Sequence, residues 1–269
     1  MTFRAGSSTE SGEMNQHSQQ GTYLYAIVRA ASVEVAGLKG VADSGAVRLV
    51  SHRQLAVAVG DVSLSVLDIP EEELSEDGRL AELATTHDAV VRALFAQGPA
   101  LPLRLATVVS NDEAAIRVLE ELYDEATQRL CELEGRREWG VRLRRDSTQA
   151  RTASTEGDGA RPTGTAYLQR RRQALRAAED ARQQERDISE DVFARLGTLA
   201  SEMGRQPGTS AEVILNAAYL VATAAEDAFL AAVELQAEAL ASQGVRLELT
   251  GPWPPYSFAQ MSSPAVTDA

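Results

Sequence analysis

The side chains that most often carry catalysis or bind metals are few in this sequence, and they are widely separated. The three histidines are His17, His52 and His87, and the single cysteine is Cys131. None of them has the spacing of a zinc site or of a nucleophile and its base, and no glycine-rich phosphate loop joins a strand to a helix. We therefore expect no catalytic residue, no metal and no cofactor. We interpret His87 as a capping or packing residue of a helix.

An acidic cluster is a first candidate for binding. Glu71, Glu72 and Glu73 lie between Pro70 and Gly78, in a segment without a clear hydrophobic period. Such a segment is typical of a solvated loop or of the first turn of a short helix, where carboxylates suit the helix dipole. We expect these three glutamates to support the association of a partner protein through long-range attraction.

A basic run on a predicted helix is the counterpart of this cluster. Arg170, Arg171 and Arg172 are followed by Arg176 in a chain that is otherwise acidic. The run could bind an acidic helix or the chain's own acidic cluster. Pairing at i,i+4 with the acids at 179 and 180 is the commoner outcome for such a pattern.

The most unusual segment is GPWPPYSF, residues 251–258. Its three prolines fix φ and remove backbone donors, so it is predicted to follow an extended path after a strand. Three aromatic side chains, Trp253, Tyr256 and Phe258, are then available to pack. Two interpretations remain open: a stiff extension that covers the core of its own domain, or a surface that binds a partner.

Composition excludes several classes of function. The chain has 269 residues and a net charge of -13, so it repels phosphate backbones and nucleic acid is not an expected partner. One cysteine allows no intrachain disulfide, which favours a reducing, cytoplasmic compartment. The polar start of the chain resembles no signal peptide, and no apolar run approaches the roughly 20 residues of a membrane helix, so we expect no membrane partner.

Hydrophobic periodicity predicts an α+β fold in two domains. The expected divisions are a disordered tail at 1–21, an N-terminal α+β domain at 22–143, a flexible linker or insertion at 144–164, a smaller C-terminal α+β domain with long helices at 165–260, and a second disordered tail at 261–269. The N-terminal domain contains a predicted hairpin at 47–59, helices at 86–96 and 111–134, and a last strand at 139–143.

Five segments together resemble the gas vesicle protein F/L (GvpF/GvpL) family. They are YLYAIV from Tyr23, LPLRLATVV from Leu101, EWGVRL from Glu138, GTAYLQRRR from Gly164 and LTGPWPPYSFA from Leu249. They occur in order over nearly the whole predicted folded chain. Family members commonly have phenylalanine and glycine after the arginine of LPLR, where this chain has Leu105 and Ala106, so only Arg104 is matched there.

The resemblance implies a non-enzymatic accessory protein of gas vesicle formation that is cytoplasmic and associated with the vesicle. Its implied partners are the small hydrophobic shell protein and other accessory proteins, and it would limit aggregation of the shell protein during nucleation. The resemblance also implies a ferredoxin-like N-terminal domain with an antiparallel sheet. Arg104, Trp253, Tyr256, Phe258 and the three glutamates are the candidate partner-binding residues. The alternative is a small-molecule enzyme or sensor that uses His87 and Arg104 in a cleft. Self-association is left open.

Overall fold

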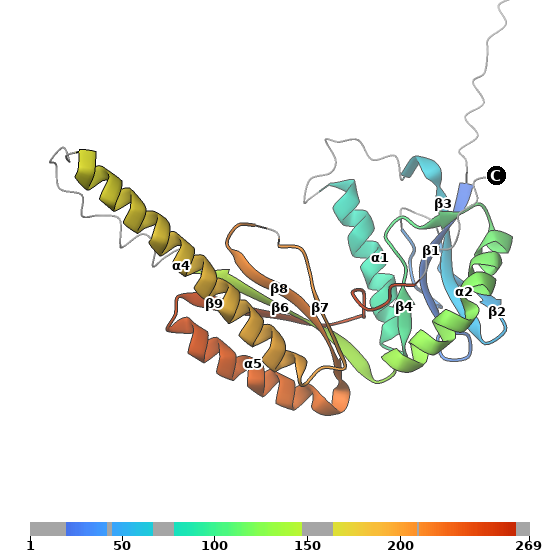
Figure 1. The fold of residues 1–269 in the computed structure, drawn as a ribbon. Helices are drawn as coiled ribbons and strands as arrows, with labels where there is room; N and C mark the ends of the chain where they lie inside the picture. The colour runs from blue at the N-terminus through green and yellow to red at the C-terminus, as the bar shows by residue number, and fades with distance from the viewer. Residues whose placement is uncertain (1–19, 42–44, 67–77, 147–163, 209, 262–269) are drawn as a thin grey trace, which may run out of the picture.

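The structure is a computed structural model that describes residues 20–41, 45–66, 78–146, 164–208 and 210–261 (Figure 1). Within these residues the chain forms two antiparallel sheets and four α-helices, which confirms the α+β class. The acidic cluster, most of the predicted linker and most of both predicted tails lie outside the described residues.

The first sheet comes from the N-terminal half of the chain. Its strands are β1 (Gln20–Arg29), β2 (Arg48–His52), β3 (Leu55–Ser63), β4 (Ala100–Pro102) and β5 (Val108–Val109). The order is β2-β3-β1-β4, and β5 also pairs with β1. The predicted hairpin is confirmed as β2 and β3. A turn at residues 105–106 separates β4 from β5.

Two helices cover opposite faces of this sheet. They are α1 (Arg79–Phe95) and α2 (Asp112–Leu133). Because successive side chains of a strand point to opposite faces, Val57 and Val59 of β3 pack in the cluster that contains α2, whereas Ala56 and Ala58 pack in the cluster that contains α1. The helix α2 begins as predicted, since the Asn111 side chain accepts a hydrogen bond from the Ala114 amide at 2.9 Å.

The second sheet comes from the C-terminal half. Its elements are β6 (Arg136–Arg145), α4 (Gly164–Gly197), β7 (Glu202–Arg205), β8 (Val213–Ala222), α5 (Glu226–Ala241) and β9 (Val245–Trp253). The strand order is β7-β8-β6-β9, with all neighbours antiparallel. Both helices lie on one face of the sheet, where they share a core with Tyr219 and Phe229.

The second half therefore has the β-α-β-β-α-β order and the antiparallel sheet of a ferredoxin-like fold. We expected that topology in the N-terminal half, whose order is instead β-β-β-α-β-β-α. The strand at 139–143, expected to close the N-terminal domain, lies at the centre of the second sheet as part of β6. Its local pattern predicts a strand but does not name its neighbours, because pairing between distant strands is decided by tertiary packing.

The two halves share one hydrophobic cluster. The residues that follow β9, 254–261, are called the terminal segment below. Leu119 and Leu130 of α2 pack in the same cluster as Ala218 and Leu220 of β8 and Phe258 of the terminal segment. The face of the second sheet opposite α4 and α5 thus contributes to the core beneath α2. The terminal segment after β9 passes from the second half to the first, as Figure 1 shows.

Candidate binding site

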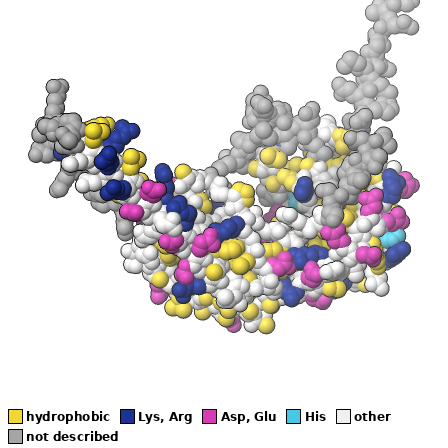
Figure 2. Space-filling model, viewed as in Figure 1, with side chains coloured by type: hydrophobic (Ala, Val, Ile, Leu, Met, Phe, Trp, Pro, Cys, Tyr) yellow, Lys and Arg dark blue, Asp and Glu magenta, His cyan; other side chains and the backbone are white. Residues whose placement is uncertain are grey.

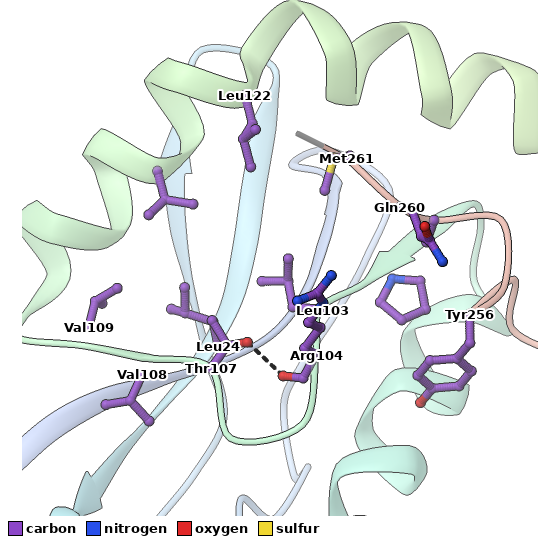
Figure 3. Close-up of a pocket in the computed structure, with 13 residues that line it drawn as sticks. Leu24, Leu103, Arg104, Thr107, Val108, Val109, Leu122, Tyr256, Gln260 and Met261 are labelled. Atoms are coloured by element: carbon purple, nitrogen blue, oxygen red, sulfur yellow. Dashed lines mark hydrogen bonds between the residues drawn. The ribbon is translucent and has the colours of Figure 1, made fainter. Parts of the chain in front are cut away.

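An apolar pocket opens between β1, α2, the β4–β5 turn and the terminal segment (Figure 3). Its volume is about 440 Å³. The lining side chains are mostly aliphatic, and the polar ones lie mainly on the turn and on the terminal segment. The lining residues are Leu24, Pro102, Leu103, Arg104, Thr107, Val108, Val109, Val118, Leu122, Tyr256, Ala259, Gln260 and Met261. A pocket of this kind suits an apolar side chain or segment more than a charged metabolite.

The turn that forms one wall is held by backbone and side-chain hydrogen bonds. The Arg104 carbonyl accepts from the Thr107 hydroxyl at 2.7 Å and from the Thr107 amide at 3.1 Å. The Thr107 carbonyl in turn accepts from the Leu24 amide of β1 at 2.9 Å. Ala106 adopts a φ of 62°, and its amide donates to the buried Tyr23 hydroxyl at 3.0 Å. The position of Arg104 is therefore fixed by the backbone of the turn.

Arg104 is exposed at the rim of the pocket, and Leu105 beside it is 37% exposed. Among the described residues, Arg104 has no ion pair. A positive charge beside an apolar pocket favours a ligand that presents an apolar group next to a carboxylate.

Trp253 and Tyr256 contact α1 of the first half. The Arg92 guanidinium lies over the Trp253 ring at 4.0 Å from its centroid, and the Tyr256 hydroxyl donates to Asp88 Oδ1 at 3.1 Å. Burial, followed by the neighbouring Asp88 carboxylate, raises the pKa of Tyr256. We expected these aromatic rings to reach the helices of their own sheet. That expectation is wrong, because Trp253, the last residue of β9, and Tyr256 just beyond it both lie against α1.

A buried carboxylate fixes the next residue of the segment. The Ser257 amide donates to Glu138 Oε2 at 2.8 Å, and the Ser257 hydroxyl donates to Oε1 at 2.6 Å. Glu138 belongs to β6 and is 8% exposed. Burial raises the pKa of Glu138, and the two hydrogen bonds from Ser257 act in the opposite direction. Glu138 thus positions the segment rather than facing solvent.

Phe258 also connects the two halves of the chain. Its ring is 7% exposed in the cluster shared by the two halves, and its carbonyl accepts from Arg129 Nε of α2 at 2.8 Å. The same guanidinium reaches Glu202 of β7 at 2.7 Å and Glu132 at 2.6 Å. Hydrogen bonding to these two carboxylates raises the pKa of Arg129 despite its partial burial. One arginine therefore joins α2, the terminal segment and the second sheet.

His87 does not line the pocket. It is 3% exposed, and its Nδ1 is 2.9 Å from the Tyr23 hydroxyl. Burial lowers the pKa of His87, and burial raises the pKa of Tyr23 to about 12. The alternative of a cleft shared by His87 and Arg104 thus finds no support in the described residues, and His87 packs as a core residue of α1.

The structure brings together some of the predicted site residues and leaves others untested. Arg104 and Tyr256 line one pocket, and Trp253 and Phe258 connect the halves beside it. Glu71, Glu72 and Glu73 lie outside the described residues. Sequence reasoning missed the arginine at 129 and the glutamate at 138. A carboxylate within the apolar strand pattern EWGVRL is the signal that could have identified Glu138.

Neither a metal-binding cluster nor a membrane-spanning helix is found among the described residues. They contain no group of three or more histidine, cysteine or acidic residues placed to hold a metal ion. No helix among them is both long enough and apolar enough to cross a membrane.

Comparison with known proteins identifies the family. The family model described as "Gas vesicle synthesis protein GvpL/GvpF" matches residues 21–260. The chain is 34% identical over 256 residues to gas vesicle protein L of Streptomyces sp. (strain CB03234), covering 91% of this chain and 94% of that protein. It is 28% identical over 253 residues to gas vesicle protein F of the same strain, covering 89% and 99%.

Solved structures agree on the fold. The crystal structure of gas vesicle protein GvpF from Anabaena sp. PCC7120 superposes with a TM-score of 0.67 at 21% identity, over 91% of this chain and 98% of that one. GvpF from Microcystis aeruginosa superposes with a TM-score of 0.58 at 19% identity, over 90% and 99%. The family match extends over both sheets and through the terminal segment that connects them. The chain therefore belongs to the gas vesicle GvpL/GvpF family.

Proposed function

We propose that this protein is an accessory factor of gas vesicle assembly that binds the hydrophobic shell protein and other accessory proteins, in the cytoplasm and at the vesicle. The names of the relatives support a role with gas vesicles in general. The apolar pocket beside Arg104 supports the finer proposal, and it is the observation on which that proposal depends.

The physical reason is the nature of the shell subunit. A protein that assembles into a wall around gas must expose apolar surface before assembly, and exposed apolar surface aggregates. A partner that covers part of this surface delays aggregation. Because the partner here has a net charge of -13, complexes repel one another as well. In this proposal the pocket takes up apolar side chains of the shell protein, and Arg104 pairs with an adjacent carboxylate.

A light-scattering assay tests this proposal. Shell protein is diluted from denaturant alone, with the wild-type chain, and with Val118→Gln, which puts an amide on the α2 wall of the pocket. The matched control is Leu235→Gln on α5, where the native side chain is 67% exposed and away from the pocket. We expect the wild type and the control to suppress scattering and Val118→Gln to lose most of this effect. Equal suppression by all three proteins would refute the role of the pocket.

The role of Glu71, Glu72 and Glu73 in association is a separate prediction. If they support association through long-range attraction, replacing all three with glutamine will lower the association rate and its salt dependence while the dissociation rate stays the same. A change confined to dissociation would contradict this role.

A further inference from the structure

One edge of the second sheet is unpaired. The strand β9 is the last in the order β7-β8-β6-β9, and β6 is its only neighbour among the described strands (Figure 1). The helices α4 and α5 lie over one face of this sheet, where Val245, Leu247 and Leu249 pack in or against their shared core. An open strand edge presents backbone donors and acceptors that can pair with another strand.

The hydrogen bonds to β6 show which backbone groups of β9 face this open side. The Asp146 amide donates to the Gly244 carbonyl at 2.8 Å, so these two residues form a hydrogen-bonded pair. Such pairs recur at every second residue of an antiparallel ladder, so the even-numbered residues of 246–250 bond β6. The amides and carbonyls of residues 245, 247 and 249, which we call the β9 edge, point away from β6. None of them has a hydrogen bond to a described residue.

A charge beside the β9 edge lacks a partner of opposite sign. Arg246 lies directly opposite Arg144 of β6, and like charges in that position repel. Arg246 is exposed and has no ion pair with a described residue. Arg144, in contrast, has two acidic neighbours, Glu212 at 3.7 Å and Glu248 at 3.9 Å. A carboxylate supplied from outside the chain would therefore stabilise Arg246.

We propose that two copies of this chain pair through their β9 edges, antiparallel and about a two-fold axis at Leu247. Leu247 then faces Leu247 of the second copy, Val245 faces its Leu249, and each of these pairs exchanges two hydrogen bonds. Arg246 lies opposite Glu248 of the second copy, which supplies the missing carboxylate, and the symmetry repeats this ion pair. The two four-stranded sheets join into one, with the helices of both copies on the same face.

The charges select this register among its neighbours. Sliding one strand by two residues in either direction still pairs the groups of the two β9 edges. However, it places Arg246 opposite Arg246 of the second copy, or Glu248 opposite its Glu248, and both arrangements are unfavourable. Of these three registers, only the axis at Leu247 brings opposite charges together. The contact is short, residues 245–249 of each copy, so we expect a reversible dimer.

The outer part of α4 also lacks partners, but it does not offer two copies a matching face. All side chains at 167–184 are exposed, and the described ion pairs of this helix begin at Glu185. The four arginines between 170 and 176 thus lack the i,i+4 pairing with the acids at 179 and 180 that we expected. Figure 2 shows the dark blue side chains gathered towards the outer end. The leucines at 168 and 175 are followed at the same spacing by Arg182, so the apolar row does not continue.

Charge exchange tests both the contact and its register. Arg246→Glu places a glutamate opposite Glu248 of the second copy, and Glu248→Arg places an arginine opposite its Arg246. The double variant restores both ion pairs at the net charge of the wild type, and an equimolar mixture of the two single variants restores them between unlike copies. The control, Arg117→Glu, makes the same charge change at an exposed position on α2 that has no ion pair with a described residue.

Sedimentation equilibrium measures the association. We use about 100 µM protein because short interfaces bind weakly, and about 0.15 M salt because it screens the repulsion between two copies of net charge -13 beyond about 8 Å. We expect a weight-average mass above the monomer's 28.9 kDa for the wild type, the control, the double variant and the mixture, and the monomer mass for each single variant. A monomeric wild type would overturn the proposal. Single variants that associate like the wild type, or no recovery in either the double variant or the mixture, would also overturn it.

Amide exchange locates the contact within the strand. In NMR at the same concentration, the amides of the β9 edge should exchange more slowly in the wild type than in Glu248→Arg. The Arg246 amide bonds β6 in both proteins and should exchange equally, which makes it the internal control. Circular dichroism checks that every variant keeps its secondary structure. Equal exchange of the β9 edge amides in the two proteins would show that the copies associate elsewhere, and would overturn the proposal.

Discussion

Replacing Phe258 with alanine should reveal how strongly the terminal segment joins the two halves. The ring is 7% exposed and packs between α2 and β8. Replacing a buried phenylalanine with alanine costs about 3 to 5 kcal/mol. We take the lower end, about 3 kcal/mol, because Phe258 is not completely buried. Trp253 is only half-buried, and a cation–π contact like the one with Arg92 contributes about 1 kcal/mol at a partly exposed site.

The test is therefore which of the two variants loses more stability. Phe258→Ala should lower the free energy of unfolding by about 3 kcal/mol and the melting temperature by roughly 6 to 12 °C, and Trp253→Ala should have about a third of this effect. Urea unfolding followed by circular dichroism measures both variants. If Trp253→Ala costs as much as Phe258→Ala, the aromatic ring of Trp253 carries the connection, and our assignment of the shared core is wrong.

Three further predictions concern the same connection and the buried histidine. Arg129→Lys should destabilise the protein by about 1 to 2 kcal/mol in urea unfolding, because an ammonium group cannot reach the Phe258 carbonyl, Glu132 and Glu202 together; an unchanged midpoint would contradict this. Gly251→Ala should cost at least about 2 kcal/mol, since φ is 124° and a Cβ atom would lie 2.9 Å from the Glu138 carbonyl oxygen; thermal unfolding at the wild-type temperature would refute it. Burial lowers the pKa of His87 in the folded protein. As the pH falls, the unfolded chain therefore binds a proton at this histidine before the folded protein does. The stability present above about pH 6.5 is lost as the pH falls towards the folded-state pKa. His87→Gln should therefore show a smaller fall in melting temperature than the wild type between about pH 7.5 and 5.5, and an identical fall would contradict the assignment.

The local elements were predictable because their signals are local. The hairpin of β2 and β3 follows from two short apolar runs around a polar turn, and the start of α2 follows from the cap at Asn111.

What could not be predicted depends on contacts between distant residues. The pattern of 139–143 indicates a strand, but only packing decides that β6 pairs with β8 and β9. For the same reason the aromatic residues of the terminal segment were recognised as packing residues, while their contact with α1 was missed. The role of Arg129 depends on three partners from three parts of the chain, and a single helical arginine carries no signal of that kind.

Site-specific photo-crosslinking tests the central proposal most directly. A photoreactive amino acid is placed at Val118 in the pocket wall and, as a control, at Leu235 on the exposed side of α5, in cells that produce the shell protein. Our account predicts an adduct with the shell protein from position 118 and little or none from position 235. Adducts of equal yield from both positions, or none from position 118 with shell protein present, would contradict binding of the shell protein at the pocket.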